Sequence, residues 1–244
     1  MPKKTKQEAS KKVNCTKPTT AEYTFPNELH SLRKGNPSFK FLPQPVVEFE
    51  DKIILIRKFF SPSLCQALTK SFGNSAENDY QHMEPFVQRG SKDYAARFND
   101  RFQILDEIVA NEVLWPYLRE ILEQHEYVMK NLDFKNAQGL NPQLRCYRYT
   151  KGHYFGKHYD ESVNISNGTN TTRWTLLIYL TGGPDELVGG DTIFHSSLQK
   201  NKTLSVHPER GMALLHKHGD DCLLHEAQMV KKGVKWVLRS DVYF

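Results

Sequence analysis

Two metal-ligating side chains lie two residues apart in the C-terminal half of the chain, as His158-Tyr159-Asp160. The residues before them resemble a strand, and successive side chains of a strand point to opposite faces, so His158 and Asp160 share one face. Both can bind the same metal ion, and His225 is the best candidate for a third ligand. Two imidazoles and one carboxylate on one face of an octahedral ion leave three positions open. That ligand set is typical of non-haem Fe(II) oxygenases.

A His-x-Asp triplet does not by itself establish a metal site. An isolated triplet is more commonly a surface histidine beside a loop aspartate. A second triplet, His218-Gly219-Asp220, is a poorer candidate, because only His225 follows it and too little chain lies between for separate strands. A zinc hydrolase also uses two histidines and one carboxylate. Lys235, ten residues after His225, favours the oxygenase, because a zinc hydrolase does not require it.

The combination of His158, Asp160, His225 and Lys235 resembles the Fe(II)/2-oxoglutarate-dependent oxygenases of the prolyl 4-hydroxylase type. In that family a lysine ten residues beyond the second histidine pairs with the far carboxylate of 2-oxoglutarate. Further segments are similar to the family's core strands, so the resemblance covers residues 143–244. These segments are residues 148–158, 175–180, 189–194 and 208–215.

The resemblance implies a set of cofactors. Fe(II) would be held by His158, Asp160 and His225, with 2-oxoglutarate as cosubstrate, O2 as oxidant and ascorbate as reductant. Lys235 would bind the far carboxylate of 2-oxoglutarate through a charge-assisted hydrogen bond, which is about twice as strong as a neutral one. The alternative for Lys235 is a surface position on the final strand.

Three more residues are candidates for the cosubstrate site. Tyr149 and Tyr179 resemble tyrosines with which the family hydrogen-bonds 2-oxoglutarate, although each can also be a core aromatic with a locally satisfied hydroxyl. Arg239 lies on the same strand face as Lys235 and is the fallback cation. An ion pair between Arg239 and Asp241 or Glu226 is its structural alternative.

Candidate substrate contacts come from two segments. Residues 97–103 interleave charged and aromatic side chains, so Asn99 or Arg101 is expected to face the substrate cleft. The alternative is a structural strand in which Asp100 pairs with an arginine. Arg173 lies where related prolyl hydroxylases place a substrate-contacting arginine.

The basic charge of the chain is concentrated at its N-terminus. The whole sequence has 33 basic and 28 acidic residues, and residues 1–20 contain six lysines against one glutamate. Residues 21–244 therefore hold 27 of each and are formally neutral. Residues 1–40 are predicted to form a solvated, mostly disordered arm. Nucleic acid is expected as a partner only through this arm, because a dedicated binding face usually has a basic excess.

The remaining pattern predicts a mainly β domain over residues 41–244. Residues 46–60 predict a strand or hairpin, and Ser61-Pro62 is typical of a helix start. Apolar residues at helical spacing from Leu105 to His125 predict a helix that Pro116 kinks and that packs outside the C-terminal sheet. Residues 131–141 and 161–172 predict loops, the second a lid over the metal site. Strands are expected at 173–180, 191–195, 202–207, 212–217, 222–226 and 234–243.

Many short strands separated by glycine and proline favour a sandwich or barrel. By resemblance this is a double-stranded β-helix (jelly roll), with a helical and strand buttress over residues 41–142 and a catalytic core over residues 143–244. Four scattered cysteines, no secretory signal and no apolar membrane span predict a protein of the cytoplasm or nucleus.

The resulting functional hypothesis is a hydroxylase that acts on a protein or peptide side chain, with proline as the leading candidate. The alternatives are the same chemistry on a small molecule or a nucleic acid, and a non-catalytic jelly-roll binding module. All four key residues are present, which counts against the module.

Overall fold

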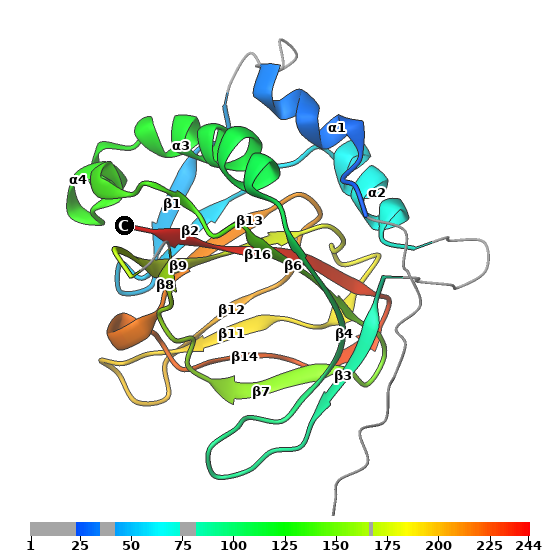
Figure 1. Cartoon of the computed structure of the whole chain (residues 1–244). Helices are drawn as coiled ribbons and strands as arrows, with labels where there is room; N and C mark the ends of the chain where they lie inside the picture. Colours follow the sequence, from blue (N-terminus) through cyan, green and yellow to red (C-terminus); the bar gives the residue numbers. More distant parts are fainter. Residues whose placement is uncertain (1–22, 35–41, 74–81, 166–167) are drawn as a thin grey trace, which may run out of the picture.

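A single curled antiparallel sheet dominates the computed structural model, which describes residues 23–34, 42–73, 82–165 and 168–244 (Figure 1). Its strands, in the order in which they lie side by side, are β1 (Pro45–Glu48), β2 (Ile53–Ile56), β13 (Ala213–Lys217), β9 (Asn170–Tyr179), β16 (Lys235–Tyr243), β6 (Gln143–Tyr149), β4 (Arg97–Leu105), β7 (Tyr154–His158), β14 (His225–Ala227), β11 (Thr192–His195) and β12 (Thr203–Val206). The sheet curls so that β7, β14, β11 and β12 lie across from β13, β9, β16 and β6. The predicted jelly-roll fold with flanking helices is confirmed.

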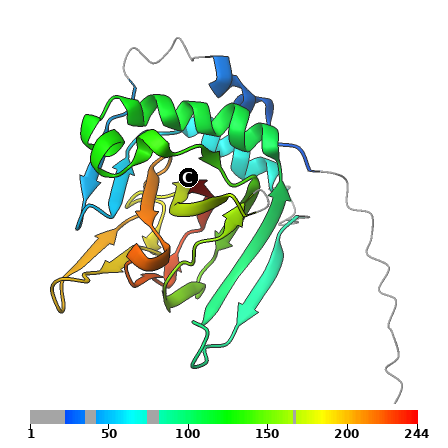
Figure 2. The ribbon, with the colours of Figure 1, turned by 60° about the vertical axis from the view of Figure 1, so that its left-hand side comes forward.

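Three short strands extend the main sheet, and two more form a small sheet of their own. They are β3 (Glu84–Gln88) beside β4, β5 (Gly139–Leu140) beside β16, β8 (Asn164–Ile165) beside β9, and a separate pair of β10 (Val188–Gly189) with β15 (Val230–Lys232). The β3–β4 hairpin projects beyond the rest of the sheet (Figure 2). The predicted 161–172 loop is partly a hairpin, because β8 pairs with the first residues of β9.

Helices cover one face of the sheet. They are α1 (Asn27–His30), α2 (Pro62–Ser71), a π-helix (Ile108–Leu114), α3 (Trp115–Glu123) and α4 (Glu126–Asn131), with 3-10 turns at Ser31–Lys34, Phe134–Asn136 and Gly219–Asp221. As predicted, Ser61 caps α2, and its hydroxyl accepts a 3.2 Å hydrogen bond from the Leu64 amide. None of the described helices is long and apolar enough to cross a bilayer.

The helix predicted from Leu105 begins later, at Ile108. Leu105 instead ends β4, with its side chain 77% exposed. Pro116 lies in the first turn of α3, immediately after the π-helical turns. Proline cannot donate a helical hydrogen bond, and at the start of a helix it needs none. It therefore separates two helical segments of different winding, which together pack on the outside of the sheet.

The prediction of a disordered arm over residues 1–40 is wrong for residues 23–34, while residues 1–22 and 35–41 lie outside the described residues. Tyr23, Phe25 and Leu29 are buried in the helix-side core, and Tyr23 stacks on Phe72 with ring centroids 5.4 Å apart. The high lysine and proline content of residues 1–40 led to the prediction of disorder, although three apolar residues, Tyr23, Phe25 and Leu29, lie close together in this segment. The ordered part of the chain reaches back at least to Tyr23.

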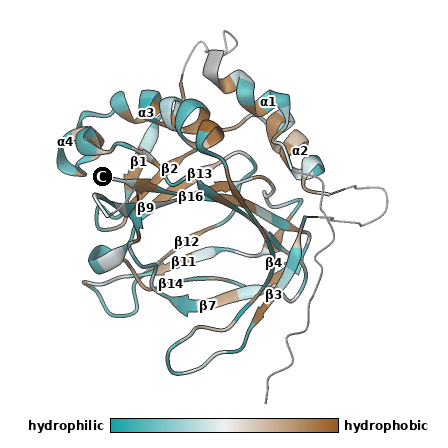
Figure 3. Cartoon of the chain, in the orientation of Figure 1, coloured by the Kyte–Doolittle hydropathy of each residue, from teal (hydrophilic) through white to brown (hydrophobic). Residues whose placement is uncertain are grey.

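The buried apolar side chains form two hydrophobic cores. Hydrophobic and hydrophilic residues are interspersed along the strands that separate them (Figure 3). On β16, Trp236 and Leu238 face the helices, whereas Val237 faces the inside of the curl. This follows from the two-residue period of a strand. The inner core is the smaller one, and it surrounds the cavity that contains the candidate site.

Candidate metal centre and cosubstrate pocket

The three predicted metal ligands meet inside the curled sheet. His158 ends β7 and His225 begins the neighbouring β14, where the two residues are paired in register. Their ring centroids lie 4.2 Å apart. Asp160 follows β7, with carboxylate oxygens 3.6 Å from His158 Nε2 and 3.9 Å from His225 Nε2. These spacings suit three ligands around one ion.

The backbone fixes the tautomer of both histidines. His158 Nδ1 lies 2.8 Å from the carbonyl oxygen of Gly156, and His225 Nδ1 lies 2.9 Å from that of Leu223. Because a carbonyl oxygen only accepts, each Nδ1 carries the proton. Each Nε2 then presents a lone pair toward Asp160, and such orientation of ligand imidazoles is typical of metal sites.

Electrostatics prepares the same three groups for a cation. Burial lowers the pKa of His158 to about 3, and the neighbouring His225 adds to this effect. Burial likewise lowers the pKa of His225. Burial alone would raise the pKa of Asp160, but the Arg239 guanidinium and the surrounding imidazoles hold it well below its usual range. At neutral pH the cluster has two neutral imidazoles and one carboxylate, so these residues fit a divalent metal ion.

Arg239 orients the carboxylate ligand. Its Nη2 is 3.0 Å from Asp160 Oδ2 and 3.0 Å from Asp241 Oδ1. Thr175 donates a 2.9 Å hydrogen bond to Asp160 Oδ2. The predicted structural alternative for Arg239, an ion pair with Asp241, is therefore present. Although Arg239 lines the cavity, its charge is already shared between two aspartates, so it is a poorer fallback cation for a ligand.

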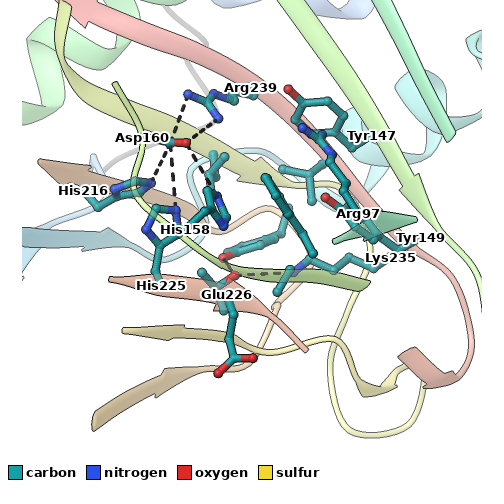
Figure 4. Close-up of a pocket in the computed structure, with 16 residues that line it drawn as sticks. Arg97, Tyr147, Tyr149, His158, Asp160, His216, His225, Glu226, Lys235 and Arg239 are labelled. Atoms are coloured by element: carbon teal, nitrogen blue, oxygen red, sulfur yellow. Dashed lines mark hydrogen bonds and ion pairs between the residues drawn. The ribbon is translucent and has the colours of Figure 1, made fainter. Parts of the chain in front are cut away.

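Lys235 occupies a different end of the same cavity (Figure 4). Its side chain is 2% exposed, and Nζ donates a 2.6 Å hydrogen bond to the Gly190 carbonyl oxygen. Among the described residues no carboxylate forms a salt bridge with it. Burial lowers the pKa of Lys235 to about 7, although Asp191 partly offsets this effect. A buried cation without a paired anion suits an anionic ligand.

Both predicted tyrosines lie beside this lysine. Lys235 Nζ is 5.6 Å from the ring centroid of Tyr149 and 5.4 Å from that of Tyr179. The Tyr179 hydroxyl also shares a 2.7 Å hydrogen bond with Thr192 Oγ1. Lys235, Tyr149 and Tyr179 therefore lie together at one end of the pocket, apart from the metal ligands.

The expected substrate contacts on β4 need correction. Asn99 is 2% exposed and bonds to Arg97 and to the Asp100 carbonyl oxygen, while Arg101 packs over the Phe86 ring at 4.1 Å. Neither residue lines the metal cavity. The alternative of a structural strand holds, because Asp100 pairs with Arg148 at 2.7 Å.

Arg97 is the β4 residue that does reach the cavity, and the sequence analysis missed it. Its guanidinium carbon lies 4.5 Å from the ring centroid of Tyr147 and 4.4 Å from that of Phe155. The two-residue period of a strand places Arg97 on the same face as Asn99 and Arg101, so the sequence alone could have suggested it. Arg97 reaches the cavity because it pairs with Phe155 of β7. That pairing cannot be read from the sequence.

Arg173 does not line the metal cavity either. It lies toward the outer end of β9, where Nη1 is 3.3 Å from Asp133 Oδ2 and the guanidinium covers the Phe244 ring at 4.9 Å. It lines a separate hollow with His218. The strand carries Arg173 too far along the sheet to meet the metal ligands.

The part of the chain that contains this site is similar to a known protein family. Residues 143–240 match the family model described as the 2OG-Fe(II) oxygenase superfamily. A search of curated proteins found no match. The matched segment contains the three metal ligands and Lys235, so this part of the chain is similar to the Fe(II)- and 2-oxoglutarate-dependent oxygenases.

Three solved structures share the fold of this chain. A viral collagen prolyl hydroxylase from Paramecium bursaria Chlorella virus-1, in its 2OG complex, is 17% identical, with a TM-score of 0.50 over 79% of this chain and 96% of that one. A prolyl-4-hydroxylase from Pseudomonas putida is 14% identical, with a TM-score of 0.51 over 78% and 92%. A prolyl hydroxylase from Trichoplax adhaerens, in complex with a hypoxia inducible factor peptide fragment, is 14% identical, with a TM-score of 0.52 over 78% and 83%. At these identities the three structures show that the fold is shared.

Proposed function

We propose that this protein hydroxylates a C–H bond of a protein or peptide side chain, with a prolyl residue as the leading candidate. The observation that carries the proposal is one cavity with two chemically different ends. Three metal-ligand side chains lie at one end, and the buried Lys235, which pairs with no carboxylate of the described residues, lies at the other. A dianionic 2-oxoacid needs a metal for one carboxylate and a cation for the other.

The proposed roles follow from the contacts. His158, Asp160 and His225 would hold Fe(II), whose chemistry with 2-oxoglutarate and O2 is the oxidation of an unactivated C–H bond with release of succinate and CO2. Lys235 would bind the far carboxylate of 2-oxoglutarate. Tyr149 is a proposed further hydrogen-bond donor to this anion.

Apolar side chains also line the pocket, among them Leu177, Val237 and Phe155. In such a low-dielectric space the charge of Lys235 acts more strongly than it would in water. We propose that this is how one lysine is sufficient to orient the far carboxylate of 2-oxoglutarate.

The peptide substrate rests on two observations. One solved neighbour is a prolyl hydroxylase in complex with a peptide fragment. In this chain, the β3–β4 hairpin projects beyond the sheet while Arg97, at the start of β4, lines the cavity. We propose that a peptide lies along this hairpin and that Arg97 helps to position its reacting residue.

Two further proposals concern conditions. Ascorbate is the proposed reductant that keeps the iron in its ferrous state. The buried cysteines Cys65, Cys146 and Cys222 are free thiols, a state that supports a reducing compartment such as the cytosol or nucleus.

The decisive experiment is succinate release from 2-oxoglutarate by the purified protein with Fe(II), ascorbate and O2, followed by mass spectrometry of proline-containing peptides incubated under ¹⁸O2. We expect succinate, and a peptide product heavier by one ¹⁸O atom. His158→Ala should abolish both, while Lys235→Ala should recover succinate release only at high 2-oxoglutarate. The matched control is Lys157→Ala, an exposed lysine on β7.

The outcomes separate the alternatives. Succinate coupled to a small molecule or a methylated nucleic acid, and not to any peptide, would keep the chemistry and reject the substrate class. Protein that forms no succinate and shows no metal-dependent 2-oxoglutarate binding by calorimetry would be a jelly-roll binding module instead.

A further inference from the structure

One cation of the cavity has no carboxylate beside it. Arg97, at the start of β4, is partly buried and lines the same cavity as the metal ligands and Lys235. Among the described residues no carboxylate forms a salt bridge with Arg97, and the charges that act on its guanidinium include a second cation, Arg239. A charge that is withdrawn from water without a counter-charge is unfavourable, so the position of Arg97 calls for an anion.

Aromatic rings surround the guanidinium instead. Its carbon lies 4.5 Å from the ring centroid of Tyr147, 4.4 Å from that of Phe155 and 5.4 Å from that of Phe86. Nε donates a 2.7 Å hydrogen bond to Asn99 Oδ1, a neutral amide oxygen that brings no negative charge. Figure 4 shows Arg97 beside Tyr147 on the cavity wall. The ring contacts hold the guanidinium in place, and its planar fork can still bind a carboxylate.

Arginines of the neighbouring strand show the contrast. On β6, which pairs with β4, Arg148 forms a 2.7 Å salt bridge with Asp100, and Arg145 lies 3.2 Å from a carboxylate oxygen of Asp241. Both arginines therefore have their counter-charge within the protein. Arg97 has only the amide and the rings.

The two carboxylates that line the cavity are engaged elsewhere. Asp160 belongs to the metal cluster and is bound by Arg239. Glu226 has a carboxylate oxygen 3.2 Å from His195 Nε2, and Figure 4 shows its carboxylate directed away from Arg97. The missing anion therefore has to come from a ligand.

Cofactor and cosubstrate would not supply this anion. Asp160 and the near carboxylate of 2-oxoglutarate would balance the two charges of Fe(II), and the far carboxylate would balance Lys235. Arg239 already lies 3.0 Å from Asp160 and 3.0 Å from Asp241. With these partners assigned, Arg97 is left with an uncompensated positive charge in the loaded site. The substrate is the remaining component that can provide a counter-charge.

We propose that Arg97 binds a carboxylate of the substrate, close to the carbon that is hydroxylated. This inference deepens the proposed function and rests on it. The carboxylate can come from two sources, the acidic side chain of a residue next to the reacting one in a peptide, or the α-carboxylate of the reacting residue itself. Both offer the planar, bidentate partner that a guanidinium prefers.

Probes that differ by one charge test this assignment. We would saturate the full-length protein with Co(II) and 2-oxoglutarate, so that the metal and Lys235 are occupied, and measure the Kd of each probe from the paramagnetic broadening of its proline ring protons. One pair is N-acetyl-L-proline and its amide. The other pairs are the capped tetrapeptides Ala-Pro-Glu-Ala and Ala-Glu-Pro-Ala, each with its glutamine counterpart. In the wild type we expect the carboxylate member of at least one pair to bind about tenfold more tightly.

The variants locate the origin of that preference. Arg97→Gln should raise the Kd of the carboxylate probe to that of its amide and leave the Kd of the amide unchanged. Arg97→Lys should retain part of the preference, because it keeps the charge but loses the planar fork. The matched control is Arg101→Gln, since Arg101 packs over the Phe86 ring at 4.1 Å but does not line the cavity. This variant should keep the full preference.

The results bear separately on the two proposals. Equal affinities within every pair, or no broadening by any probe, would overturn the role of Arg97 from the wild type alone, and intact 2-oxoglutarate binding would leave the proposed function standing. A preference that survives in a folded Arg97→Gln protein, or that Arg101→Gln removes equally, would also overturn it. A preference confined to N-acetyl-L-proline would support the α-carboxylate as the source, and one confined to the peptides would support the side chain. Protein that binds no 2-oxoglutarate but still prefers the carboxylate probes through Arg97 would keep this assignment and reject the proposed function.

Discussion

The two faces of the main sheet are built from the same strands but differ in what their side chains do. On β16, Trp236 and Leu238 belong to the hydrophobic core on the helix side of the sheet. On the opposite face of the same strand, Lys235, Val237 and Arg239 line the cavity. Because side chains alternate between the two faces of a strand, every second residue of β16 packs in the helix-side core, and the residues between them line the cavity.

The difference between the faces lies in how polar atoms are satisfied. Polar atoms of the helix-side core have partners within the protein, such as the Tyr117 hydroxyl, which donates a 2.7 Å hydrogen bond to the Phe59 carbonyl oxygen. The cavity side contains buried polar groups that are only partly paired, notably Lys235 and His216. Such groups cost stability unless a ligand completes them. Substitutions on the two faces should therefore have opposite effects on folding and on ligand binding.

The largest expected effect comes from removing a metal ligand on the cavity side. Asp160→Ala should abolish measurable succinate release, because it removes both a ligand and the partner of Arg239. The protein should still fold, because the helix-side core is untouched. Circular dichroism and calorimetric titration with Co(II) would check this, and a folded Asp160→Ala protein with wild-type metal affinity would contradict the assignment.

The next largest effect should come from the opposite face. Leu238 is 2% exposed in the helix-side core, and Leu238→Ala should lower the free energy of unfolding by about 2–5 kcal/mol. It should leave the Kd for 2-oxoglutarate unchanged in the folded protein. Denaturant unfolding and calorimetry would measure the two quantities.

The neighbour of Leu238 supplies the matched control. Val237 is 3% exposed but lines the cavity. Val237→Ala removes fewer buried carbons, so its unfolding free energy should fall less, while its Kd for 2-oxoglutarate should rise. If both variants changed only stability, the functional division between the two faces would be wrong.

A smaller effect with a characteristic pH dependence is expected at Lys235, whose pKa burial lowers to about 7. A bound carboxylate favours the protonated lysine, so binding above pH 7 takes up a proton. Affinity is then full below pH 7, and the Kd for 2-oxoglutarate should rise about tenfold per pH unit above it, until the raised pKa of the complex is reached. Calorimetry in buffers of different ionisation enthalpy would detect the proton.

Two variants test the origin of this dependence. Lys235→Met should weaken 2-oxoglutarate binding by roughly 10- to 100-fold at pH 7, the loss of one charge-assisted hydrogen bond. Lys235→Arg keeps its charge at every pH examined and should remove the dependence above pH 7. A steep dependence that persists in Lys235→Arg would show that another group titrates.

The amino-acid sequence was sufficient to predict the elements with a clear period. The spacing of His158, Asp160, His225 and Lys235 predicted a shared site, and all four residues line one cavity. The strands at residues 192–195, 203–206, 213–217 and 235–243 were predicted to within two residues. Local rules work here because each element is decided by its own alternation and turn residues.

Features that depend on long-range pairing were missed. Arg97 reaches the cavity only because β4 pairs with β7, and His216 faces Asp160 only because β13 lies beside β9. Both contacts join segments about 60 residues apart in the chain. His216 and His218 are both buried, but only His218 has hydrogen-bond partners for both ring nitrogens.

The smallest expected effect concerns how the carboxylate ligand is held. Arg239 touches both Asp160 and Asp241, whereas Arg145 touches Asp241 alone, with Nη1 3.2 Å from Oδ2. Arg239→Lys keeps the charge but loses the planar fork that reaches two carboxylates. Because partners that orient a ligand typically contribute 10- to 100-fold to metal affinity, the Kd for Co(II) should rise about tenfold.

Arg145→Lys is the matched comparison, since it disturbs the same buried Asp241 without touching Asp160. Its Kd for Co(II) should stay within about twofold of the wild type, even if both variants lose similar stability. Equal losses of metal affinity in the two variants would mean that the effect travels through Asp241 and the sheet. A loss of metal affinity in Arg239→Lys alone would show that this arginine acts on the metal centre by positioning Asp160. The cavity face of β16 would then serve metal binding, while the opposite face of the same strand stabilises the fold.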